Sequence, residues 1–73
     1  MKLNEVKDLK TLILKDIADE SLKVRLSSFG FVSGAKLMVQ SRIKGMMLVK
    51  VLNSTYAIND FLAEKFLVEQ INE

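Results

Sequence analysis

One short segment, residues 26–34, restricts the possible fold more than any other part of the chain. It reads LSSFGFVSG, and its start continues an apolar helical face made of Leu22, Leu26 and Phe29. Gly30 stands where the end of a helix requires a positive φ, and Phe31 can fold back on the last turn. Ser33-Gly34 then favours a tight turn. The segment therefore predicts the end of a helix, a turn and the start of a strand.

Residues 35–44 carry the clearest strand pattern in the sequence. Apolar and polar residues alternate throughout, and the mostly apolar face holds Ala35, Leu37, Val39, Ser41 and Ile43. Such a strand is typical of an antiparallel sheet with one buried face. Lys44-Gly45 follows as a hairpin signal, so we expect the next strand to pair with this one.

The rest of the chain predicts short elements joined by tight links. We expect a turn at residues 3–6, a helix over residues 21–29 capped by Asp19 or Ser21, and a helical turn from Asn59 to Ala63. Further strands are expected at residues 11–17, 46–52, 55–58 and 65–71. Closing such strands into a barrel removes exposed edges. The prediction is a mainly β fold, a small five-stranded SH3-like barrel with one short α-helix and a C-terminal helical turn, forming one domain over residues 1–73.

The sequence contains neither cysteine nor histidine. This removes disulfides, thiolate sites, the common nucleophilic triads and most transition-metal chemistry. Asp16, Asp19 and Glu20 lie close together but lack a calcium-loop pattern, and they favour a solvated, capping turn. We predict no enzyme activity and no catalytic, metal-binding or cofactor-binding residue. Any role of the protein in iron biology would therefore be indirect.

Charge is distributed unevenly along the chain. Residues 21–59 hold six basic residues and no acidic one, and the basic residues are Lys23, Arg25, Lys36, Arg42, Lys44 and Lys50. Such a block suits an acidic protein surface, phosphates or simply solvent. No apolar run approaches the roughly 18 residues of a membrane span, and the N-terminus lacks a signal-peptide core. We therefore expect a cytoplasmic protein that does not insert into a membrane.

Two groups of residues suggest a surface for a protein partner. Met38, Met46 and Met47 crowd one predicted hairpin, and methionines adapt to partner surfaces. Lys23 and Arg25 lie on the helix side away from its apolar face. The predicted partner surface comprises Lys23, Arg25, Leu26, Met38, Met46 and Met47. Packing in the core or self-association into a homodimer would also explain the methionines.

The run Arg25-Leu26-x-x-Phe29-Gly30-Phe31-x-x-Gly34 resembles the R-L-x-x-L-G-L-x-P-G signature of FeoA-type proteins. Phe29, Gly30 and Gly34 are the structural part of that signature. Ser33 replaces the usual proline, and Leu9 replaces a usual glycine before the first strand. The similarity continues at both ends of the chain, in Leu3-Asn4-Glu5-Val6 and in Ala57-Ile58 followed by Ala63-x-x-Phe66-x-Val68.

The resemblance implies an SH3-like barrel that binds the cytoplasmic G-protein region of the FeoB ferrous-iron transporter as an accessory protein. The same barrel forms a C-terminal module of DtxR-type metal-dependent repressors. No helix-turn-helix precedes the barrel here, which favours a stand-alone protein. The alternative is a small nucleic-acid-binding or transcription-related module. Nucleic acid is not the expected partner, because no aromatic residue is interleaved with the basic strand positions.

Overall fold

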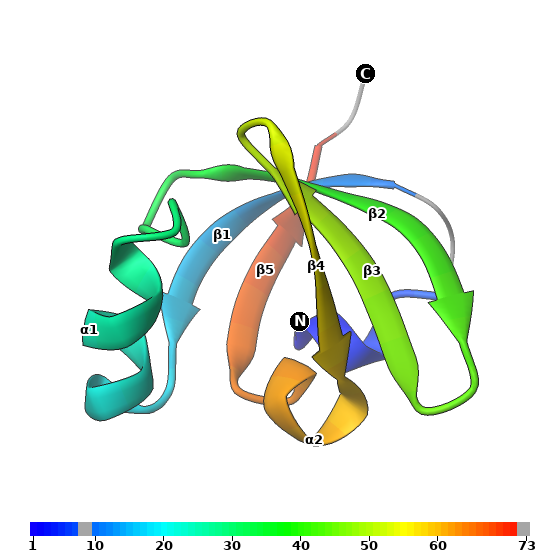
Figure 1. Cartoon of the computed structure of the whole chain (residues 1–73), viewed down its shortest axis with the longest axis horizontal. Helices are drawn as coiled ribbons and strands as arrows, with labels where there is room; N and C mark the ends of the chain where they lie inside the picture. Colours follow the sequence, from blue (N-terminus) through cyan, green and yellow to red (C-terminus); the bar gives the residue numbers. More distant parts are fainter. Residues whose placement is uncertain (8–9, 72–73) are drawn as a thin grey trace.

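Five antiparallel strands form one strongly curved sheet in the computed structural model, which describes residues 1–7 and 10–71 (Figure 1). Leu9 lies outside the described residues. The strands follow the order β4-β3-β2-β1-β5 across the sheet. Their bounds are β1 Thr11–Ile17, β2 Lys36–Ile43, β3 Met46–Val51, β4 Ser54–Asn59 and β5 Phe66–Gln70. The 3-10 turn η1 (Leu3–Glu5) and the helices α1 (Glu20–Ser27) and α2 (Asp60–Ala63) complete the fold. The predicted mainly β, SH3-like fold is confirmed.

The core is entirely apolar within the described residues, where no buried polar or charged residue occurs. Alternate strand residues fill it, as expected for a sheet with one face turned inward. Leu3 and Val6 from the N-terminal turn close one side, and Phe31 and Phe66 meet edge to face with ring centroids 5.6 Å apart. The strand contributions are Leu12, Leu14, Ile17, Leu37, Val39, Met47, Val49, Val51, Ile58 and Val68.

Helix α1 is capped at both ends by residues that its local sequence predicts. At its start, the Leu22 amide donates a hydrogen bond of 3.0 Å to Oδ1 of Asp19, the capping residue. At its end, the Phe31 amide donates to the Leu26 carbonyl at 3.2 Å and Gly30 to Ser27 at 3.1 Å. This pair of bonds is a Schellman motif, with Gly30 at φ +100°. The helix ends at Ser27, two residues earlier than predicted, and this leaves Phe29 half exposed.

The predicted turn at Ser33-Gly34 is confirmed, and it also anchors the loop to β1. The Ala35 amide donates to the Val32 carbonyl at 2.9 Å, and Gly34 has φ +92°. The Gly34 amide reaches the Leu14 carbonyl at 2.7 Å, and Ser33 Oγ donates to the Lys15 carbonyl at 3.0 Å. These bonds fix the loop between α1 and β2 against the barrel.

A β-bulge overturns one prediction for β2. The alternation was expected to keep Ile43 on the apolar face, but the register against β3 shifts between Val39 and Ser41. Beyond the shift, Ile43 is 62% exposed and Arg42 is opposite the buried Met47. Arg42 Nη1 donates to the Val6 carbonyl at 2.6 Å, and Nη2 lies 3.6 Å from Oδ1 of Asp60. The bulge therefore turns an arginine toward the N-terminal segment and α2.

Candidate functional site

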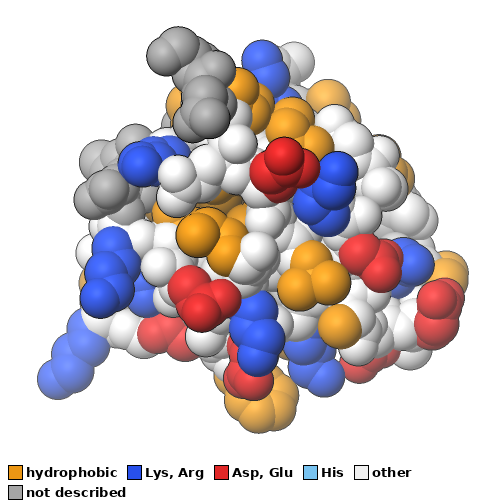
Figure 2. Space-filling view, turned by 180° about the vertical axis from the view of Figure 1, so that it is seen from behind, with side chains coloured by type: hydrophobic (Ala, Val, Ile, Leu, Met, Phe, Trp, Pro, Cys, Tyr) orange, Lys and Arg blue, Asp and Glu red, His pale blue; other side chains and the backbone are white. Residues whose placement is uncertain are grey.

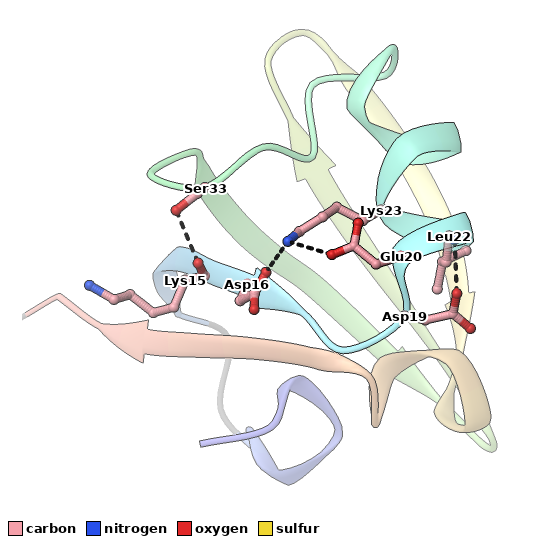
Figure 3. A network of polar contacts seen from close by, with 7 residues as sticks. All are labelled: Lys15, Asp16, Asp19, Glu20, Leu22, Lys23 and Ser33. Atoms are coloured by element: carbon pink, nitrogen blue, oxygen red, sulfur yellow. Dashed lines mark hydrogen bonds and ion pairs between the residues drawn. The ribbon is translucent and has the colours of Figure 1, made fainter.

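Lys23 of α1 is already paired within the chain. Its ammonium lies 2.8 Å from Oδ1 of Asp16 on β1 and 3.6 Å from Oε1 of Glu20 (Figure 3). The hydrogen bond and charge of Asp16 raise the pKa of Lys23, and the same bond lowers the pKa of Asp16. Lys23 therefore ties the helix to the barrel through an ion pair at the surface.

Arg25 and Leu26 differ from Lys23 and from each other. Arg25 is exposed and makes no ion pair with any residue that the structure describes. Leu26 is half-buried against the core, and its carbonyl accepts the Phe31 hydrogen bond that ends the helix. Of the three predicted helix residues, Arg25 is thus the one whose charge is available, while Leu26 holds the helix in place.

The predicted methionine cluster is divided by the fold. Met47 is fully buried, so its assignment to a partner surface was wrong: it faces inward on β3 and cannot contact another protein directly. Met38 and Met46 are 43% and 40% exposed. Met46 lies at the β2–β3 turn, on the side of the molecule opposite α1 (Figure 1). The six predicted residues therefore do not form one continuous surface.

Met38 instead lines a groove that the sequence did not reveal. The groove, of about 610 Å³, runs between the loop after α1 and the outer face of β2 and β3. Its apolar lining includes Val32, Met38 and Leu52, and Lys36 and Lys50 lie on the same wall of strands. Met38 and Lys50 are directly opposite in the β2–β3 register as a result of the bulge, because a regular hairpin around Lys44-Gly45 would place Met38 opposite Val51. We call these five residues the β2–β3 groove.

A second, smaller cavity of about 240 Å³ lies between α1, β4 and α2. Its lining is mostly apolar and includes Leu26, Phe29, Tyr56 and Leu62. Tyr56 meets Phe29 and Phe31 in edge-to-face contacts, with centroids 5.7 Å and 5.4 Å apart. These ring contacts explain why Phe29 is ordered against β4 although half of it is exposed.

Within residues 1–7 and 10–71, no three His, Cys, Asp or Glu side chains gather in a way that could hold a metal ion. Over the same ranges, no helix is long and apolar enough to cross a membrane.

The acid dependence of stability offers a test of how α1 is anchored. The Leu22 hydrogen bond and the Lys65 ammonium, 3.4 Å away, lower the pKa of Asp19. A carboxyl whose folded pKa is lowered stabilises the fold above its unfolded pKa of about 3.9, and this contribution disappears as pH falls through the folded pKa. We expect Asp19→Asn to flatten the decline of the unfolding midpoint between about pH 5 and about pH 2. An unchanged pH profile in that variant would contradict the assigned role.

The family model of the FeoA domain matches residues 1–70 of the chain. The chain belongs to the FeoA family. Among solved structures, the solution structure of FeoA from Chlorobium tepidum aligns with a TM-score of 0.87 at 25% identity, covering 99% of this chain and 71% of that one. A crystal structure described as an iron uptake regulatory protein (FeoA) aligns with a TM-score of 0.80 at 25% identity, covering 97% and 96%.

The same fold occurs within larger proteins. ScaR with bound Cd²⁺ aligns with a TM-score of 0.87 at 19% identity, covering 97% of this chain but only 35% of ScaR. At that identity the likeness is one of fold alone. No curated protein sequence matches the chain significantly. Gly30 and Gly34, the two glycines of the FeoA-type signature, both have a positive φ.

Proposed function

We propose that this FeoA-family protein is a non-enzymatic, cytoplasmic accessory protein of bacterial ferrous iron uptake. It acts as a single domain over residues 1–73 and binds the cytoplasmic G-protein region of the FeoB transporter. The observation that carries the proposal is the family match over residues 1–70. A similar solved structure, described as an iron uptake regulatory protein, also supports a role in iron uptake or its regulation.

The charge and exposure of the described residues favour docking to an acidic protein surface. Arg25, Lys36 and Lys50 lie in the stretch of residues 21–59 that has no acidic residue, and none of them makes an ion pair within the described ranges. Complementary charge of this kind speeds encounter and selects the partner. Partly exposed Met38 adds adaptable apolar contacts.

A nucleic-acid-binding role is the second candidate, because the fold also occurs in a manganese-dependent transcriptional repressor and in the metal-dependent transcriptional regulator MtsR. Two of the six basic residues, Lys23 and Arg42, are held by carboxylates. On the face seen in Figure 2, acidic and basic side chains are interspersed. Retention on DNA or RNA that falls steeply with salt would favour this candidate, and no retention at low salt would remove it.

The proposed function is tested by calorimetric titration against the isolated G-protein region of the FeoB from the same genome. The titration is done without nucleotide, with GDP and with a non-hydrolysable GTP analogue. We expect saturable binding that is stronger in one nucleotide state. Absence of binding both to this region and to the purified full-length transporter would refute the proposal.

Arg25→Glu is expected to weaken this binding about tenfold, because it reverses a charge available to an acidic partner. Arg25 is exposed, and its side chain makes no ion pair or hydrogen bond with any residue that the structure describes, so the unfolding midpoint should stay near that of the wild type. Lys44→Glu is the matched control, since it reverses an exposed charge at the β2–β3 turn, far from α1. Equal effects of the two variants, or a parallel loss of stability in Arg25→Glu, would argue against a docking role for Arg25.

A further inference from the structure

Leu52, the first residue of the β3–β4 turn, has an unusual backbone conformation. Its φ of 56° makes it the one non-glycine residue with a positive φ in the described ranges. Glycine and asparagine adopt this region readily, whereas a bulky side chain is strained there. A turn of this kind would form more easily without a leucine. The fold therefore gives no reason for leucine at this position.

The Leu52 side chain is also badly placed for stability, because 75% of it is exposed. It nevertheless lies in a defined place, against the backbone of Gly30. A Cβ atom added to Gly30 would stand only 2.8 Å from Leu52 Cδ1. An apolar side chain that is strained, exposed and still held against a neighbouring loop is typical of a residue selected for contact with another molecule.

The surroundings of Leu52 define the chemistry of that molecule. Leu52 stands at one end of the β2–β3 groove, with Val32 47% and Met38 43% exposed along it. Lys36 and Lys50 flank these apolar side chains, and neither forms an ion pair with any described residue. No acidic residue lies within residues 21–59 to neutralise them. The groove therefore combines an apolar floor with two available positive charges.

We propose that the β2–β3 groove is the docking site for an extended acidic and apolar segment of a protein partner. An apolar side chain of the segment packs between Met38 and Leu52, and its carboxylates pair with Lys36 and Lys50. This inference rests on the proposed function, so the segment belongs to the G-protein region of the transporter. Charge complementarity is the observation that selects this occupant.

Two other occupants fit the groove less well. An anionic membrane is flat, whereas the lysines and apolar side chains line a concave surface. A second copy of the chain could offer Phe61, which is 74% exposed between Asp60 and Glu64. That contact would join two different surfaces, and such head-to-tail contacts produce open chains unless their rotation closes a ring.

The test compares Leu52→Asn with the wild type in titrations against the isolated G-protein region. We expect Leu52→Asn to lose about tenfold in affinity, because it removes the apolar anchor of the contact. Its unfolding midpoint should equal or exceed that of the wild type, since asparagine tolerates a positive φ. Phe61→Gln is the matched control: it removes an equally exposed apolar side chain outside the groove and should keep wild-type affinity.

The lysines give a second readout. Lys36→Gln and Lys50→Gln should each reduce the salt dependence of binding, because each removes one charge pair. In amide spectra of the labelled protein, Gly34, Lys36, Met38 and Leu52 should shift on addition of the G-protein region.

The outcomes separate this site from the function on which it rests. If Leu52→Asn binds with wild-type affinity, the groove is not the docking site, but the proposed function remains intact. No binding by the wild type to the region or to the full transporter overturns both. Binding to phosphatidylglycerol vesicles that Leu52→Asn abolishes would assign the groove to lipid. Self-association that Phe61→Gln abolishes would assign it to a second copy. Either result would contradict the proposal that the groove binds a protein segment of the transporter.

Discussion

Phe31→Ala is expected to cost about 3–5 kcal/mol of folding free energy, the largest loss among the substitutions considered. Phe31 is 2% exposed and sits where three parts of the chain meet. Its ring contacts Tyr56 of β4 and Phe66 of β5 edge to face, at 5.4 Å and 5.6 Å. Its amide also closes the end of α1 on Leu26. Truncation leaves a cavity that these fixed elements cannot fill.

This loss is large compared with the total stability of such a domain. At about 0.05–0.15 kcal/mol per residue, a chain of this length has about 4–11 kcal/mol. Phe31→Ala should therefore unfold at much lower urea concentration than the wild type, measured by far-ultraviolet circular dichroism. If it does not fold, Phe31→Leu, which leaves a smaller cavity, should show an intermediate loss.

Phe29→Ala is the matched control for this prediction. Phe29 belongs to the same segment and also contacts Tyr56 edge to face, at 5.7 Å, but it is 49% exposed. We expect a cost of about 1 kcal/mol, close to the value of one aromatic pair and part of its burial. Equal losses for the two phenylalanines would show that Phe31 is not the central packing residue.

The parts of the fold that the sequence predicted are those decided by neighbouring residues. Asp19 and Asn59 cap helices through amides three residues ahead, at 3.0 Å and 2.8 Å. Gly30 and Gly34 adopt the positive φ values that their places in the turn require. Each of these choices depends on a few adjacent residues, so a short pattern contains the information. The strand positions followed because tight turns leave little freedom in where the next strand begins.

The parts that the sequence could not predict depend on distant residues. The bulge in β2 is accompanied by the contacts of Arg42 with Val6 and Asp60, which lie 36 and 18 positions away in the numbering. Met47 occurs in a strand that is apolar on both faces, so alternation alone could not decide which methionine faces the core. The Asp16 partner of Lys23 lies on β1, so the sequence of the helix alone could not show that this charge is paired within the chain.

The functional surface was predicted least completely, for a related reason. Sequence reasoning selected Met38 from its place on the polar face of a strand, and it is exposed as expected. It assigned Leu52 to the end of a strand, because leucine is not a usual residue for a turn with positive φ. The groove between Met38 and Leu52 arises only when the β3–β4 turn comes to lie over Gly30. Such a site requires the tertiary structure to be seen.

Gly30→Ala is expected to cost about 1–2 kcal/mol, the strain of a side chain in the left-handed region. Gly45→Ala is the control, because Gly45 also has a positive φ, +77°, and a Cβ there would meet nothing within 4 Å. The atom nearest to the new Cβ at Gly30 is the end of an exposed leucine side chain, which can move away. Urea unfolding should therefore give similar losses for the two variants. A loss in Gly30→Ala that far exceeds the control would show that Leu52 is packed too firmly to move.

The two glycine variants should differ in binding even where they agree in stability. The new methyl group in Gly30→Ala displaces Leu52 from its place at the end of the β2–β3 groove, whereas Gly45 lies at the β2–β3 turn, away from that groove. We expect Gly30→Ala to weaken binding to the G-protein region and Gly45→Ala to leave it unchanged. In a Leu52→Asn background, Gly30→Ala should have no further effect on affinity, because the displaced anchor is already gone. Additive losses in the double variant would mean that Gly30 affects docking by another route. Full coupling would mean that this glycine has two roles: it ends α1, and it leaves room for the leucine that contacts the partner.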